Sequence, residues 1–194
     1  MKFDHEKFFQ AYRQAFGTLR QSQVDGLESL LTGLDLDNAV NDVRWAAYML
    51  ATVKHECADT WQPIEEYGKG RGREYGKPVV VEDGQGNSIS NVYYGRGYVQ
   101  LTWKDNYQKI GQALGLGDEL MISPEQVLKP DIAYRVMSHG MRHGTFTGAS
   151  LARYIDASHC DYRNARRIIN GLDRCDTIAD YARSLQAVLT SAQV

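Results

Sequence analysis

The chain has 194 residues, of which 43% are hydrophobic, 24% charged and 10% aromatic, a composition typical of one globular domain and not of a disordered chain or a coiled-coil rod. Its 22 basic and 24 acidic residues give a net charge of −2, so it lacks the basic excess that is typical of nucleic-acid-binding proteins. No apolar run reaches the ~18 residues that a membrane span requires.

Apolar residues at helical spacing predict three helices in the N-terminal part of the chain. The first covers about residues 4–16, and the second follows a capping-box pattern at residues 22–25 and continues to about Leu34. The third covers about residues 38–57. One face of this third helix carries four side chains spaced by four, three and four residues: Trp45, Met49, Thr52 and Glu56.

A small β lobe is predicted next, because glycine becomes dense between Pro63 and Gly97. Residues 79–81 and 92–94 are rich in valine and tyrosine and are separated by turn residues, which predicts a β-hairpin. A second capping-box pattern predicts a helix from Thr102 to about residue 114. Apolar spacing predicts the remaining helices at 132–143, at 162–170 and from Thr177 onward. We therefore expect an α+β fold, mostly α, in which 1–194 form a single domain with a cleft beside the β lobe.

Glu56 is a candidate general acid, because it shares a helix face with Trp45 and Met49. A carboxyl group that lies against apolar neighbours loses hydration and can hold a proton near neutral pH. Glu65 and Glu66 follow in a loop, and one of them could face Glu56. Two carboxyl groups in different environments can serve as the acid and the base of glycoside hydrolysis. Solvent-exposed carboxylates would fit the same pattern, so the pattern alone leaves their role open.

Residues 93–103 are the least generic segment of the chain. Two glycines permit a close backbone approach, and the aromatic side chains offer flat faces that stack on sugars or bases. Neutral donors and acceptors follow at Gln100, Thr102 and Asn106, and the last two are four residues apart. The segment fits either a binding site for a polar ligand or a buried aromatic hairpin that leads into a helix.

Three runs taken together resemble glycoside hydrolase family 19, which contains chitinases of plants and bacteria and endolysins of bacteriophages. The runs are 51–56 (ATVKHE) with Glu65, 94–103 (YGRGYVQLTW) with Asn106, and 169–171 (ING). The resemblance covers about residues 45–185, and the N-terminal helices within 1–37 are poorly covered. It implies a lysozyme-like fold with a substrate cleft and inversion at the anomeric carbon. Neither a metal nor another cofactor is expected.

The resemblance also implies roles for individual residues. Glu56 matches the general acid, and Glu65 matches the base that activates a water, with Glu66 as the alternative. Thr102 matches the hydroxyl residue that orients this water. An inverting pair should hold its carboxyl groups ~6.5–9.5 Å apart. Six further residues are expected to bind substrate: Tyr94, Arg96, Gln100, Trp103, Asn106 and Asn170.

The chain departs from the family pattern near these residues. Cys57, Ala58 and Asp59 follow Glu56 where the family usually has small Thr, Ser and Gly residues, so Asp59 adds an acid close to the site. Tyr181 stands where we expect an arginine of the family. Both departures concern the surroundings of the two candidate acids.

Other kinds of site receive less support. A zinc protease would need a second histidine at position 59, which is Asp59. His139 and His143 could share a metal, but no third ligand is evident, which favours histidines on a helix surface. We expect Cys57 to be a buried thiol. A basic loop at 68–73 could contact acidic or sugar groups of a polymer. A second basic stretch fits either a solvated helix face or a contact with an anionic polymer, and it contains Arg163, Arg166 and Arg167.

The expected function is hydrolysis of a polymer of N-acetylated amino sugars. Peptidoglycan is the preferred substrate and chitin the alternative, because the chain shows no signal peptide and no plant-type disulfides. These features suit an endolysin, which is made in the cytoplasm and acts on the cell wall after release. Three free cysteines, Cys57, Cys160 and Cys175, agree with a reducing compartment. The expected partner is the glycan polymer, with no nucleic acid and no membrane span, and the expected state is a monomer. A catalytically weak glycan-binding module is the second alternative.

Overall fold

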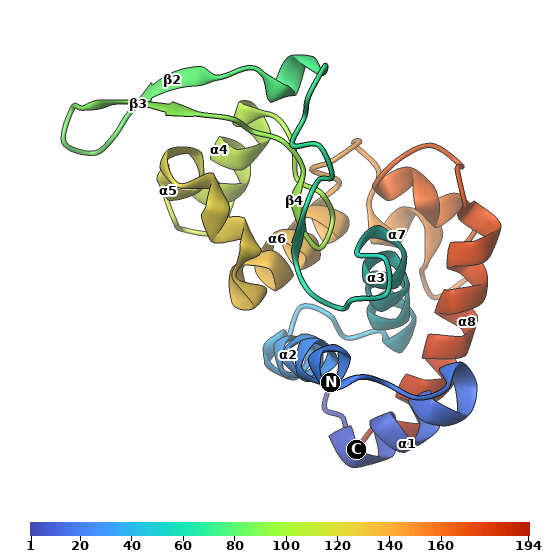
Figure 1. Ribbon diagram of the computed structural model, residues 1–194. Coiled ribbons are helices and arrows are strands. Elements are labelled where there is room, and N and C mark those ends of the chain that lie inside the picture. The colour runs from blue at the N-terminus through green and yellow to red at the C-terminus, as the bar shows by residue number, and fades with distance from the viewer.

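The computed structural model describes all 194 residues and shows a mostly helical protein with two small antiparallel sheets (Figure 1). The α-helices are α1 His5–Phe16, α2 Gln21–Leu36, α3 Val43–Glu56, α4 Lys104–Ala113, α5 Glu119–Ile122, α6 Pro130–His143, α7 Leu151–Tyr154 and α8 Cys175–Ala192. The strands are β1 Ile64–Glu65, β2 Val79–Glu82, β3 Ser88–Asn91 and β4 Arg96–Gly97. Three short 3₁₀ helices complete the chain: η1 Glu74–Gly76, η2 Pro124–Leu128 and η3 Asn164–Ile168.

Helix α3 lies inside the helical body and packs along α8, which also packs against α1. All its residues from Ala46 to Lys54 are buried, because the helix is apolar on nearly every face. The two ends of the chain meet, since the Asp4 backbone N–H donates to the Ala192 carbonyl at 2.7 Å (Figure 1). A single cluster of 48 buried hydrophobic residues forms the core. None of the helices is both long and apolar enough to cross a membrane.

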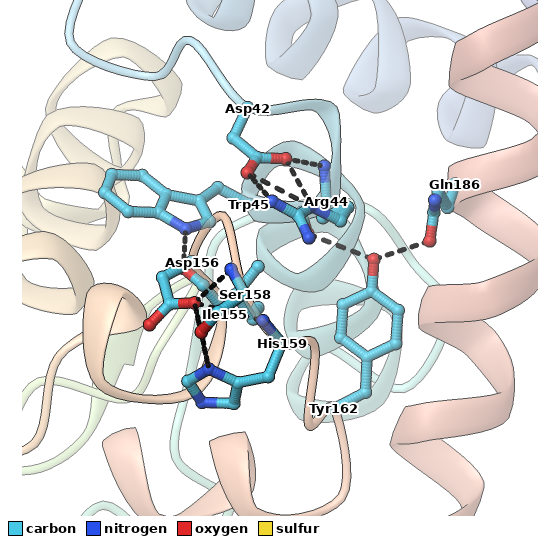
Figure 2. Close-up of polar contacts among 9 residues, drawn as sticks. All are labelled: Asp42, Arg44, Trp45, Ile155, Asp156, Ser158, His159, Tyr162 and Gln186. Carbon is cyan, nitrogen blue, oxygen red and sulfur yellow. Dashed lines mark hydrogen bonds and ion pairs between the residues drawn. The ribbon is translucent and has the colours of Figure 1, made fainter.

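The first turn of α3 is held by polar contacts, which Figure 2 shows. Asp42 caps the helix by accepting from the Arg44 backbone N–H at 2.9 Å, and Trp45 Nε1 donates to the Ile155 carbonyl at 2.9 Å. Tyr162 Oη lies 3.4 Å from the Arg44 carbonyl oxygen of α3 and donates to Gln186 Oε1 of α8 at 2.9 Å. These contacts fix the start of α3, and the rigid helix therefore fixes the place of its last residue, Glu56.

The predicted hairpin exists, but its second strand lies earlier than expected. Strand β2 pairs with β3 (Val79 opposite Asn91, Glu82 opposite Ser88), and the hairpin projects from the helical body (Figure 1). Residues 92–94 are not a strand, because Tyr93 and Tyr94 turn into the core and lead to β4. Strand β4 pairs with β1, which places Ile64 opposite Gly97 and Glu65 opposite Arg96.

Helix boundaries differ from the prediction at several places, among them the start of α4, which lies at Lys104 and not at Thr102. Helix α3 begins at Val43 because Asp42 caps it, and α8 begins at Cys175, two residues before Thr177. The predicted helix at 162–170 is only the short 3₁₀ helix η3. Here the Asp161 carboxylate accepts from both the backbone and the side chain of Asn164, and such local bonds compete with α-helical ones.

Candidate functional site

Glu56 is the last residue of α3, and its carboxyl group meets a buried arginine. Arg166 Nη1 lies 2.5 Å from Glu56 Oε1, and the exposed side-chain fractions are 4% for Arg166 and 17% for Glu56. Arg166 Nε donates to the Asp173 carbonyl at 3.1 Å, which fixes the guanidinium. The expectation that Glu56 lies against apolar neighbours therefore omitted its main partner.

Arg166 belongs to the candidate site through this contact, although its role was not expected from the sequence. It was expected on a solvated or polymer-facing helix surface together with Arg163 and Arg167, and this is wrong because Arg166 is 3% exposed. The neighbouring Ala165 and Ile168 are also buried. The available signal for burial was an arginine beside apolar residues on the inner side of a short helix. The local sequence does not indicate that its partner is Glu56, which lies 110 residues away.

Glu65 lies in β1 and is held by two side chains. Tyr94 Oη donates to Glu65 Oε1 at 2.5 Å, and Lys69 Nζ lies 2.8 Å from Oε2. The hydrogen bond from Lys69, followed by the hydrogen bond from Tyr94, holds the pKa of Glu65 below its usual range. About a third of the side chain is exposed (34%). Glu65 is therefore kept ionised while it remains accessible to water.

Glu66 has a different environment. Its Oε1 accepts from Tyr75 Oη at 2.8 Å, and its Oε2 accepts from the Gly95 backbone N–H at 3.1 Å. The Glu66 backbone N–H also donates to the Gly95 carbonyl at 2.7 Å. Glu66 thus joins the segment after β1 to the segment before β4, and these bonds give it a structural role.

The end of α3 and the pair β1–β4 are in contact, which brings Glu56 and Glu65 into one region. Cys57 Sγ lies 3.9 Å from the Gly97 carbonyl oxygen and 3.7 Å from that of Tyr98. Gly97 in turn pairs with Ile64, the residue before Glu65. Cys57 is buried, as predicted, and burial raises its pKa to about 12.

Tyr94 and Arg96 are buried behind Glu65. The Arg96 guanidinium lies 3.6 Å from the centre of the Tyr94 ring and donates to the Val92 carbonyl at 2.9 Å and to Tyr107 Oη at 3.1 Å. Their exposed fractions are 8% and 6%. In this structure they support the carboxylate of Glu65, and their expected contact with substrate stays a prediction.

The neutral polar residues of the expected site gather around a small cavity. Gln100, Thr102 and Asn106 line it together with Ile169, and its volume is about 80 Å³. Asn106 Nδ2 donates to the Thr102 carbonyl at 3.0 Å, and Gln100 Nε2 donates to the Ile64 carbonyl at 3.2 Å. The structure therefore brings together three residues that the sequence assigned to one site.

Two further expected binding residues are at the surface. Trp103 is 50% exposed, and its ring meets the Tyr75 ring edge-on at a centroid distance of 5.5 Å. Asn170 is exposed and follows Ile169, which lines the cavity. Both side chains are accessible to a ligand.

Nothing in the chain groups three His, Cys, Asp or Glu side chains in an arrangement that could hold a metal ion. His139 and His143 stack with ring centroids 4.2 Å apart on α6. His143 Nδ1 lies 3.0 Å from the His139 carbonyl oxygen. This pair has no third ligand.

Comparisons with solved structures confirm the predicted fold class, a lysozyme-like α+β fold. Chitinase C from Streptomyces griseus HUT6037 superposes with a TM-score of 0.63 and 22% identity, over 96% of this chain and 78% of that chain. A bacterial family 19 chitinase superposes with a TM-score of 0.57 and 20% identity, over 96% and 94% of the two chains. At these identities the likeness shows the fold alone.

Sequence comparisons show the family. The chain is 50% identical over 38 residues to the acidic 26 kDa endochitinase of Solanum lycopersicum and 45% identical over 47 residues to the acidic endochitinase pcht28 of Solanum chilense. These segments span 20% and 24% of this chain but only 15% and 19% of the two relatives. The model of the family described as chitinase class I matches residues 32–137, more than half of the chain. The chain therefore belongs to glycoside hydrolase family 19, the chitinase class I family.

Proposed function

We propose that this protein hydrolyses chitin, a polymer of β-1,4-linked N-acetylglucosamine, with inversion at the anomeric carbon. Glu56 acts as the general acid and Glu65 as the general base. The observation that carries the proposal is the pair of carboxyl groups on adjoining elements, one against a buried arginine and one held ionised at the surface. Membership of a chitinase family supports this chemistry.

The contact with Arg166 determines which oxygen of Glu56 donates a proton. Oε1 accepts from the Arg166 guanidinium, so the proton of the acid form resides on Oε2. From Oε2 it passes to the glycosidic oxygen as the bond to the anomeric carbon breaks. Arg166 also keeps the carboxyl group from rotating, because its own Nε is bound to the Asp173 carbonyl.

Glu65 is suited to the role of base because it is ionised and accessible. Its lowered pKa keeps it deprotonated at neutral pH, so it can take a proton from a water that attacks the anomeric carbon from the opposite face. Thr102 is proposed to orient this water, in line with its family match.

The substrate is proposed to be chitin and not peptidoglycan, which was the first expectation from the sequence. The similar proteins are named as chitinases and endochitinases. The cavity is lined by neutral side chains, Gln100, Thr102 and Asn106, which suit the uncharged N-acetyl sugars of chitin. Exposed Trp103 offers a face for stacking on a sugar ring, and Asn170 adds a neutral amide.

Hydrolysis of chitin hexaose by the purified protein tests the proposal. NMR of the fresh product should show the α-anomer first, because inversion converts the β-linkage. Glu56→Gln and Glu65→Gln should each lower kcat by about 10²–10⁴-fold, the usual contribution of a general acid or base. Glu66→Gln should lower it less, and Glu74→Gln, which alters an exposed acid paired with Lys77, should leave it unchanged.

The same preparation is tested on purified bacterial cell walls. Wall clearing without release from chitin would replace chitin by peptidoglycan as the substrate and keep the mechanism. Binding of chitin hexaose without turnover would instead identify a glycan-binding module. A larger loss in Glu66→Gln than in Glu65→Gln would move the role of base to Glu66.

A further inference from the structure

The connection between the two proposed catalytic acids has an uncommon backbone. Residues 57–63, called here the acid-linking turn, join Glu56 at the end of α3 to β1, which carries Glu65. Ala58, Asp59 and Trp61 all have a left-handed backbone, with φ of 48°, 61° and 61°. This conformation is unfavourable for residues with a Cβ and persists only where surrounding contacts hold it.

Lys54 supplies two of these contacts. Its side chain is 8% exposed, and its Nζ lies 2.6 Å from Asp59 Oδ1. The Asp59 backbone N–H donates to the Lys54 carbonyl at 2.9 Å. Both the backbone and the side chain of Lys54 therefore bind Asp59, the third residue of the acid-linking turn.

Four aromatic rings surround the Lys54 ammonium group. Its Nζ lies 4.8 Å from the ring centre of Phe16, 5.3 Å from Tyr181, 5.5 Å from Trp61 and 5.7 Å from Tyr12. The rings come from α1, α8 and the turn itself, and Tyr12 Oη also lies 3.2 Å from Nζ. Ring faces attract a cation in this geometry, so the ammonium is held in one place.

Helix α2 holds the same turn from another side. Gln23 Nε2 donates to the Asp59 carbonyl at 2.8 Å, and Gln62 Nε2 donates to the Ser22 carbonyl at 2.8 Å. Gly26 approaches so closely that a Cβ there would lie 2.3 Å from the Trp61 carbonyl oxygen. Helix α1 and this part of α2 precede the family match, which begins at residue 32.

We propose that Lys54, through its pair with Asp59 and its aromatic surround, is a positioning residue that sets the geometry of the acid-linking turn and so places Glu65 relative to Glu56. The N-terminal helices then have a function: α1 contributes two of the rings around Lys54, and α2 packs directly against the acid-linking turn. This inference rests on the proposed function for its kinetic consequence, while its structural part concerns the turn alone.

Lys54→Met and Asp59→Asn test the proposal on the full chain, because each removes the ion pair with little change in side-chain size. A displacement of one acid by about 1 Å can cost ~10²-fold in rate. We therefore expect kcat on chitin hexaose to fall about 10- to 100-fold in each variant, with KM within about twofold of wild type. Arg183→Met, which removes an exposed ion pair of α8, is the matched control and should keep wild-type kinetics.

Cysteine labelling provides a readout that does not depend on catalysis. Cys57 begins the acid-linking turn and is buried, while Cys175 is buried at the start of α8. In Lys54→Met we expect native-state alkylation of Cys57 to become faster while Cys175 stays protected.

Each outcome has a consequence. Wild-type kcat with a protected Cys57 in Lys54→Met overturns the proposal. Loss of kcat with Cys57 and Cys175 exposed together also overturns it, because this indicates general unfolding. A wild-type protein without hydrolytic activity contradicts the proposed function, and the labelling of Cys57 then still decides whether Lys54 holds the turn.

Discussion

At the scale of single residues, the ionisation of Glu65 depends on Lys69. The Lys69 ammonium group binds Glu65 Oε2 at 2.8 Å, but its own side chain is 61% exposed. A charge in this position stabilises the carboxylate, and salt weakens the effect because water and ions reach the pair. The acid side of the pH–activity profile should therefore report on this one contact.

Lys69→Met should raise the pKa of Glu65, because it removes the largest cause that lowers it. A base is inactive when protonated, so the acid limb of the kcat/KM profile should move to higher pH while the alkaline limb stays in place. Profiles recorded at low salt measure this, and added NaCl should shift the wild type in the same direction. Lys77→Met, which alters an exposed lysine paired with Glu74, serves as the control. An unchanged acid limb in Lys69→Met would contradict the assignment of Glu65 as the base.

At the scale of elements, the contact between α2 and the acid-linking turn depends on the absence of a side chain. A Cβ at Gly26 would lie 2.3 Å from the Trp61 carbonyl oxygen, and backbone atoms cannot move aside as a flexible side chain can. Alanine is a better helix former than glycine, but the steric effect is larger than the ~1 kcal/mol gain in propensity.

Gly26→Ala should therefore lower Tm by roughly 3–10 °C, from an overpacking cost of about 1–3 kcal/mol. Thermal unfolding followed by circular dichroism measures this change. Gly84→Ala is the matched control, because a Cβ at Gly84 would meet nothing within 4 Å. A Tm for Gly26→Ala at or above that of the wild type would mean that α2 does not press on the turn.

At the scale of the whole molecule, the three thiols differ in accessibility. Cys57 and Cys175 are buried in the helical body, and Cys160 is exposed. Thiolates are the reactive form, and burial raises the pKa of Cys57 to about 12, which leaves almost none at pH 8.

Native protein should therefore take up one iodoacetamide label, on Cys160, while protein in urea should take up three. Peptide mapping by mass spectrometry identifies the labelled positions. Equal labelling of Cys57 and Cys160 in the native state would show that the end of α3 is open to solvent.

Local patterns were sufficient for most elements and indicated the candidate residues of the site. Helix α1, the β2 strand and helix α6 lie where the spacing of apolar residues predicts them, because this signal is contained within one or two turns of chain. The motifs also named Glu56, Glu65, Gln100, Thr102 and Asn106, and the structure places the last three around one cavity. The variants described above test the role of Glu56 and Glu65.

The sequence by itself determined the mostly helical class, the small β lobe and the candidate acids, because these depend on residue type and short-range spacing. Only the tertiary structure decided the partners of those acids: Arg166 for Glu56 across 110 positions, and Lys69 with Tyr94 for Glu65. It also decided that Lys54 pairs with Asp59 within four rings from three parts of the chain. The physical reason is that an ion pair forms only between groups that lie close together in the folded protein. The packing of α1, α3, η3 and α8 sets these distances.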